Sequence, residues 1–186
     1  MTTTATPVAV PIASALRRLY FARFGFALLW AAALFPTASS IGPVSATLLV
    51  LYPLFDVGAA IVDARSSRGG RSASGLYVTV AISALAAVGL VFAVASGIPA
   101  VLRVWGSWAV VAGLVQLVVA LRRRELGGQW AMIASGAIST LAGISFFLQA
   151  AAPHASLTNL AGYALLGGVF FLVSALRLGR IACESN

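Results

Sequence analysis

Residues 75–97 read GLYVTVAISALAAVGLVFAVASG, a run without a single charged side chain. A helix needs about 20 consecutive, mostly apolar residues to cross the hydrocarbon layer of a membrane. This stretch therefore predicts a transmembrane helix, and five further stretches share its character. The expected membrane spans are about 19–36, 43–64, 75–97, 100–121, 129–151 and 157–177.

The composition agrees with a chain that is embedded in lipid. Hydrophobic residues make up 61% of the 186 residues and charged residues only 9%, and the mean hydropathy is +1.01. A soluble domain is about 25% charged. The single Cys183 excludes a disulfide-stapled secreted fold. We expect an all-α membrane protein.

The arginines predict how the chain crosses the membrane, because positive residues collect in cytoplasmic connections. Arg103 alone falls on one side of the six predicted spans. The other side receives Arg17, Arg18, Arg23, Arg65, Arg68, Arg71, Arg122, Arg123, Arg124, Arg177 and Arg180. We therefore expect a multi-pass membrane protein with both termini in the cytoplasm.

The expected organisation is a cytoplasmic tail (1–18), one transmembrane domain (19–180) and a short cytoplasmic tail (181–186). A cleaved signal peptide is the alternative for the N-terminus, and cleavage after the small residues at 38–40 would leave five spans. We favour an uncleaved first helix, because Arg23 interrupts the apolar segment.

The formal net charge of +8 raises the question of nucleic acid. Binding to nucleic acid needs a basic face on a folded domain, whereas these arginines form short clusters between apolar runs. We expect no nucleic-acid partner. The consecutive arginines are instead expected to contact anionic lipid headgroups at the cytoplasmic face; they are Arg122, Arg123 and Arg124.

An internal repeat appears when the chain is shifted by 54–55 residues against itself. Residues 113–122 (GLVQLVVALR) and 168–177 (GVFFLVSALR) share the form G-x6-A-L-R. A more diverged copy, two residues shorter, runs from Gly58 to Arg65. The pattern predicts three helical hairpins of equal orientation, related by an axis along the membrane normal. They cover residues 19–65, 75–122 and 129–177.

The hairpin pattern resembles the HdeD-type bacterial membrane proteins over roughly residues 20–180. The matching residues are Gly89, Pro99, Gly113 and Arg122 in the second hairpin and Trp130, Gly136, Gly143, Pro153, Gly168 and Arg177 in the third. Leu76 departs from the pattern, since an aromatic residue is expected there, and the first hairpin fits poorly. The resemblance implies a six-span inner-membrane protein with a role in envelope or acid stress, and it implies no particular chemistry.

Polar groups inside a bilayer are candidates for function, because lipid cannot solvate them. Asp56 precedes Arg65 by nine residues, which places it about 13 Å into the membrane. Arg23 enters the first span from the same side, so its guanidinium can reach the carboxylate. Pro53 removes a backbone hydrogen bond just before Asp56. These residues predict either a structural ion pair at a helix kink or a relay for protons, ions or a small solute.

Other positions predict contacts between helices. Gln116 is expected to hydrogen-bond across a helix interface. Small residues at every fourth position let helix backbones approach closely, either within one chain or between subunits of a homo-oligomer or a complex with another membrane protein. These rows are Ser135, Ser139 and Gly143; Ala109 and Gly113; and Ala164 and Gly168.

Aromatic residues near the ends of the spans predict belts at the two membrane interfaces. Trp105, Trp108 and Tyr163 are expected at the outer interface, and Tyr20, Tyr77 and Trp130 at the inner one.

Enzymatic activity is not expected, because the sequence holds no Walker A motif, no HExxH and no Ser-His-Asp set. No metal or cofactor is expected either, with one His, one Cys and four acidic residues to act as ligands. The leading hypothesis is a non-enzymatic membrane protein that acts by interaction or by organising the membrane. The alternative is a small transporter or channel that uses the region of Asp56 and Pro53.

Overall fold

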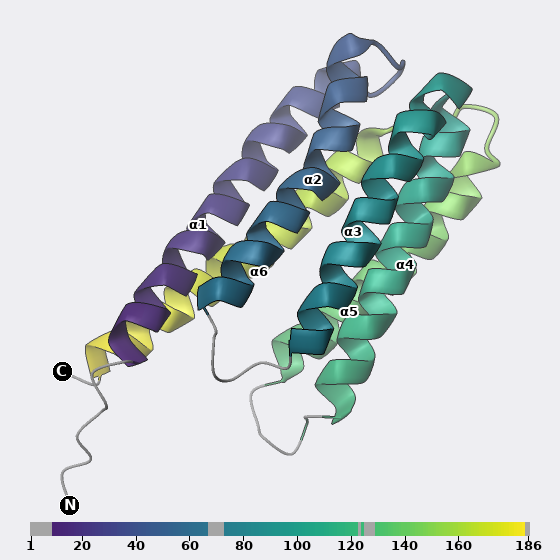
Figure 1. Ribbon diagram of the computed structural model, residues 1–186. Helices are drawn as coiled ribbons and strands as arrows, with labels where there is room; N and C mark the ends of the chain where they lie inside the picture. The colour runs from purple at the N-terminus through teal and green to yellow at the C-terminus, as the bar shows by residue number, and fades with distance from the viewer. Residues whose placement is uncertain (1–8, 67–72, 123, 125–128, 185–186) are drawn as a thin grey trace, which may run out of the picture.

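The computed structural model describes residues 9–66, 73–122, 124 and 129–184, and it is a bundle of helices (Figure 1). No strand occurs in the described residues. All six long helices are long and apolar enough to cross a membrane. The helices are α1 (Ala9–Leu34), α2 (Pro43–Ser66), α3 (Ala73–Ala93), α4 (Ile98–Arg122), α5 (Trp130–Ala150) and α6 (Thr158–Glu184), with 3-10 turns η1 (Phe35–Thr37) and η2 (Val94–Ser96).

The six predicted spans are confirmed, with differences at the two ends of the chain. Helix α1 already begins at Ala9, within the stretch expected to be a tail, and α6 continues to Glu184. The apolar span that contains most of α1 runs from Ser14 to Thr37 and so includes η1. Terminal arginines do not break a helix, so the helices extend beyond the apolar spans.

Proline and glycine set the boundaries at the turns. Pro43 is the first residue of α2, where its missing N–H would have no helical partner in any case. The buried Ser45 hydroxyl accepts a hydrogen bond from the Gly42 N–H at 2.9 Å. Gly97, which follows η2, has φ 93°, a value that L side chains rarely adopt.

The helices run alternately up and down, so the bundle has two distinct ends. We call the end where α1, α3 and α5 begin the terminal end. The opposite end, formed by η1, η2 and residues 151–157, is the turn end. The chain ends both lie at the terminal end (Figure 1).

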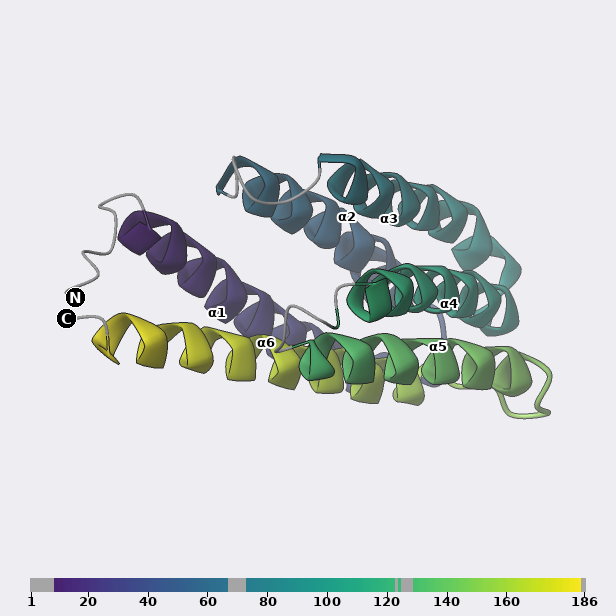
Figure 2. The ribbon, with the colours of Figure 1, turned by 90° about the horizontal axis from the view of Figure 1, so that it is seen from below.

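The closest helix packing joins different hairpins. Helix α4 packs most extensively against α5, α1 against α6, and α2 against α3 (Figure 2). The two helices within each predicted hairpin make fewer contacts with each other. The bundle is therefore three close helix pairs joined along three looser seams, α1–α2, α3–α4 and α5–α6.

Glycines explain the close approach of α4 and α5. A Cβ atom on Gly113 would lie 2.7 Å from the carbonyl oxygen of Gly136, and a Cβ atom on Gly106 would lie 2.8 Å from that of Gly143. Real Cβ atoms do not come this close to backbone oxygen. The two helices touch backbone to backbone at these points, as small residues permit in membrane proteins.

Residues that correspond in the predicted repeat do not pack against corresponding helices. Gly89 and Gly143 correspond in the predicted repeat, but a Cβ on Gly89 would meet Val104 of its own hairpin at 3.2 Å. Gly143 instead faces Gly106 of the preceding hairpin. The repeat in sequence therefore remains a prediction about the orientation of the hairpins, while the packing of its copies differs.

Aromatic side chains fill the centre of the bundle. Trp105 packs against Trp30, Tyr52 and Trp108, with ring centroids 5.5, 5.3 and 5.0 Å away. Trp105 is fully buried and Trp30 is 2% exposed. The prediction of an outer aromatic belt was wrong for Trp105, Trp108 and Tyr163, because these rings point into the bundle and not toward lipid.

Candidate functional site

An ion pair joins α1 to α2 inside the bundle, as the sequence predicts. The Arg23 guanidinium donates a hydrogen bond through Nη2 to Oδ1 of Asp56. The side chains are 15% and 16% exposed, respectively. Within a bilayer such a pair is stabilised by mutual neutralisation and by charge-assisted hydrogen bonding.

Two further hydrogen bonds extend the ion pair across the bundle. Ser83 on α3 donates from Oγ to Oδ2 of Asp56 at 2.7 Å. Trp108 on α4 donates from Nε1 to the Ser83 hydroxyl at 3.2 Å. Both carboxylate oxygens of Asp56 are thus engaged, and one polar chain connects four successive helices.

Phe171 of α6 adds a fifth helix to the site. The Arg23 guanidinium carbon lies 4.3 Å from the centroid of the Phe171 ring. A cation over an aromatic face is stabilised by roughly 0.5–2 kcal/mol, more where water is excluded. Arg23 therefore bridges α2 and α6 from its position on α1.

Pro53 lies inside α2 and its side chain is fully buried. Because proline has no N–H, it leaves the carbonyl of Leu49 without its helical donor. Nearby, Trp30 Nε1 donates to the Leu48 carbonyl at 2.6 Å. Pro53 and Asp56 thus lie on the same buried part of α2, and the α1–α2 seam carries two bonds there.

Two further polar contacts inside the spans connect helices α4, α5 and α6. Gln116 donates from Nε2 to the Met132 carbonyl on α5 at 3.2 Å, as expected for a contact between helices. Tyr163 on α6 donates from Oη to the Ser139 hydroxyl on α5 at 3.0 Å. Each of the three seams therefore carries at least one polar bond, namely Arg23–Asp56, Trp108–Ser83 and Tyr163–Ser139.

The rows of small residues lie largely inside the monomer. Ala109, Gly113, Gly143, Ala164 and Gly168 are buried. Ser139 is half-buried beneath Tyr163, and Ser135 is half-buried as well. The sequence left open whether these rows pack helices within one chain or between subunits. The buried positions pack helices of one chain together.

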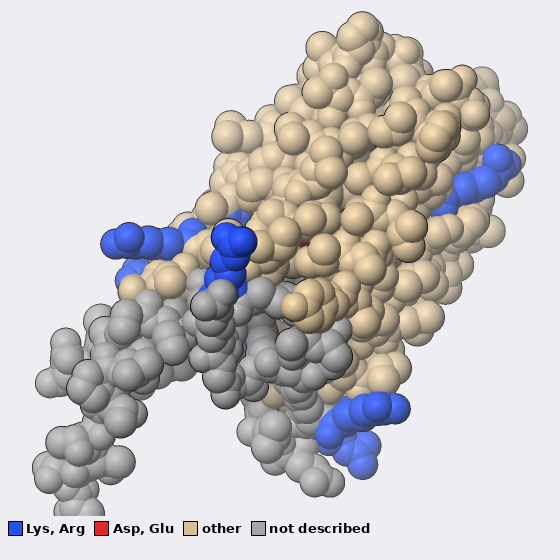
Figure 3. Space-filling view, in the orientation of Figure 1, with Lys and Arg blue, Asp and Glu red and all other residues tan. Residues whose placement is uncertain are grey.

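Arginines mark the ends of the bundle (Figure 3). Arg122 and Arg124 are exposed at the terminal end. Arg123 lies outside the described residues. Arg103 is exposed on α4 in the half nearer the turn end. These three exposed arginines are thus placed where headgroups of a surrounding bilayer would lie.

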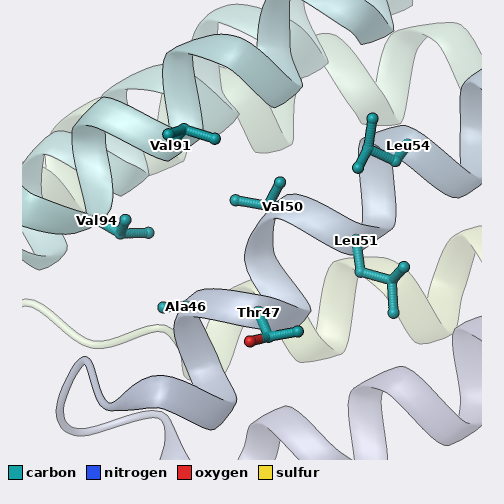
Figure 4. A pocket seen from close by; sticks show the side chains of 7 residues that line it. All are labelled: Ala46, Thr47, Val50, Leu51, Leu54, Val91 and Val94. Carbon is teal, nitrogen blue, oxygen red and sulfur yellow. The ribbon is translucent and has the colours of Figure 1, made fainter.

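A shallow groove of about 360 Å³ runs between α2 and α3 near the turn end (Figure 4). Its lining is apolar apart from one hydroxyl, and that hydroxyl, of Thr47, is bonded to the Pro43 carbonyl at 2.8 Å. Such a surface suits a hydrocarbon chain of the surrounding lipid. The lining residues are Ala46, Thr47, Val50, Leu51, Leu54, Val91 and Val94.

Sequence reasoning missed Ser83 and Trp108 as members of the site. A signal for Ser83 was present: Asp56 lies ten residues before the end of α2, and Ser83 lies ten residues after the start of α3. Antiparallel neighbours place such positions at equal depth. Trp108 gave no comparable signal, because a tryptophan in a span can face either lipid or the bundle.

In the described part of the chain, no three His, Cys, Asp or Glu side chains come together in a way that could hold a metal ion. Comparisons with known protein families, with curated proteins and with solved structures give no match for this chain. The fold and its site thus define an integral membrane protein with six transmembrane helices and an internal ion pair.

Proposed function

We propose that this chain is a non-enzymatic membrane protein of the HdeD type, with a role in envelope or acid stress. The observation that carries the proposal is that the charged groups inside the bundle, Arg23 and Asp56, are engaged by each other and by neighbouring side chains. Asp56 has protein partners on both oxygens, and Arg23 has a carboxylate on one side and an aromatic ring on the other. Such saturation favours a fixed scaffold in the membrane.

The proposed site of action is the bacterial cytoplasmic membrane, with the terminal end in the cytoplasm. The exposed arginines at that end support this orientation, and they would contact anionic lipid headgroups. Ala152→Cys in a Cys183→Ser background would test it, since Ala152 is exposed at the turn end. A membrane-impermeant maleimide added to intact cells should label this cysteine, and labelling only after lysis would reverse the orientation.

The stress role is tested by survival. Cells that lack the protein should survive an acid challenge less well than cells that carry it, and the wild-type chain should restore survival. Equal survival of both strains under acid and other envelope stresses would remove this part of the proposal. Native mass spectrometry of the gently extracted protein would identify partners, because a homo-oligomer appears at multiples of 19.0 kDa.

A second candidate is a small transporter or channel for protons, ions or a small solute. The observation that favours it is the place of the ion pair, which is partly exposed on a loosely packed seam close to Pro53 within α2. Flux in proteoliposomes would decide, with Asp56→Asn compared with Gly58→Ala. Unaltered flux in a stable Asp56→Asn protein would count against a route through this site.

A further inference from the structure

Helices α1 and α6 contact each other from near the terminal end to the middle of the bundle. Near the terminal end, the Arg17 guanidinium lies 3.1–3.3 Å from where a Cβ of Gly179 would be. Further along, the rings of Tyr20 and Phe171 are 5.9 Å apart. Toward the middle, a Cβ on Gly168 would touch α1. We call this unit the α1/α6 arm.

The arm is connected to the other four helices through the chain only at the turn end. Residues 35–42 lead from α1 to α2, and residues 151–157 lead from α5 to α6. These two connections are fastened to each other by the Leu157 N–H, which donates to the Ala38 carbonyl at 2.9 Å. The Ser156 hydroxyl donates to the same oxygen at 3.3 Å. Leu157 and Ala38 are buried, so this clasp is protected from competing polar groups.

Polar bonds between the arm and the other helices lie at different distances from the clasp. Asn159 and Tyr163 bond to α5 within the first turns of α6. Trp30 bonds to α2 about one turn before the end of α1. The Arg23–Asp56 pair lies further from the clasp than any of these.

The arm also diverges from the other helices toward the terminal end. Figures 1 and 2 both show the first turns of α1 and the last turns of α6 lying apart from α3, α4 and α5, while the same helices converge at the turn end. The ion pair thus sits where the arm begins to separate. Its partial exposure contrasts with the buried aromatic rings nearer the clasp.

We infer that the α1/α6 arm swings about the clasp at the turn end and that the Arg23–Asp56 pair is the latch that holds it against α2. The inference is independent of whether the protein is a scaffold or a transporter. A helix the length of α6 is roughly 40 Å long, so a rotation of about 10° would move its terminal end by about 7 Å. Loss of the latch should therefore open the terminal end and leave the turn end in place.

Distances between spin labels test this directly in the full-length protein in lipid nanodiscs, in a Cys183→Ser background. One label pair reports on the terminal end, at the exposed positions Leu176 on α6 and Leu121 on α4. A second pair reports on the turn end, at Phe35 and Phe92. Double electron–electron resonance then gives both distance distributions.

Asp56→Asn and Arg23→Gln break the latch from opposite sides. In both variants the terminal-end distance should lengthen and broaden, while the turn-end distance stays as in the wild type. Gly58→Ala is the matched control, since it lies on α2 close to Asp56, its added Cβ would meet no neighbour and the ion pair stays intact, and it should leave both distances unchanged. Exchange of the two charges, Arg23→Asp with Asp56→Arg, should restore the short distance.

An unchanged terminal-end distance in Asp56→Asn and Arg23→Gln would overturn the inference, because the pair would then not hold the arm. Equal lengthening at both ends would overturn it as well, since that result means general loosening without a hinge at the clasp.

Discussion

The α4–α5 interface and the α1–α2 seam hold their two helices together in different ways. At the first, four glycines remove side chains so that two backbones touch. At the second, the helices stand further apart and are joined by a tryptophan–carbonyl bond and an ion pair. Backbone contact depends on shape along several turns, whereas an ion pair depends on two side chains. The close pairs should therefore resist separation, and the seams should open when a single group is changed.

Three glycines that correspond in the predicted repeat differ in how closely a neighbouring helix approaches them. Gly113 would place a Cβ 2.7 Å from the backbone of α5, Gly168 would place one 3.1 Å from the Ala27 methyl group, and Gly58 has nothing within 4 Å. The three glycines hold the same position in the predicted repeat, but what lies next to each glycine differs. Alanine at each position is thus a graded probe of how closely the helices approach.

Gly113→Ala should have the largest effect on stability. The added methyl group would overlap the Gly136 carbonyl oxygen and the Thr140 backbone, so the helices must separate. Overpacking of this kind costs about 3 kcal/mol, near the upper end of the usual range. Unfolding in mixed detergent micelles measures it, and a loss below that of Gly168→Ala would contradict the backbone contact.

Asp56→Asn should lower the free energy of unfolding by about 2 kcal/mol, less than a fully buried pair would lose on removal of one partner. The reduction follows from the partial exposure of both side chains and from the amide oxygen, which can still accept from Ser83. The same unfolding assay applies. If the variant were as stable as the wild type, the ion pair would not hold the seam.

Ser83→Ala should cost about 1 kcal/mol, within the range found for hydrogen bonds between membrane helices. It removes the bonds of Ser83 to Asp56 and to Trp108 together. Fluorescence of the tryptophans should change along with stability, because the Trp108 indole loses its acceptor. Unaltered stability and emission would mean that neither hydrogen bond of Ser83 stabilises the protein, so that the polar chain ends at Asp56.

Gly58→Ala should be neutral or stabilise the protein by up to about 1 kcal/mol, since alanine favours a helix over glycine and the added Cβ meets no neighbour. It is the control for Gly113→Ala at the equivalent repeat position. A loss comparable to that of Gly113→Ala would show that the α2 helix is packed at this point after all.

The helices and the ion pair could be predicted from the sequence, because both depend on local features. Apolar length fixes each span, and the distance of Arg23 and Asp56 from the ends of their spans fixes their common depth. Which helices pair closely could not be predicted, since Gly58, Gly113 and Gly168 occupy equivalent places and only three-dimensional neighbours distinguish them. The prediction of an outer aromatic belt was wrong for the same reason: depth in the membrane does not reveal whether Trp105 faces lipid or the core.

The most direct test of the seam is a double-mutant cycle on Arg23 and Asp56, with Arg23→Gln, Asp56→Asn and the combined variant unfolded in the same micelles. Contacting residues show coupling of roughly 0.5–3 kcal/mol, and independent ones add within about 0.3–0.5 kcal/mol. We expect a coupling of about 2 kcal/mol or more, with the double variant no less stable than either single one. Strict additivity of the two changes would contradict an ion pair that joins the α1/α6 arm to α2.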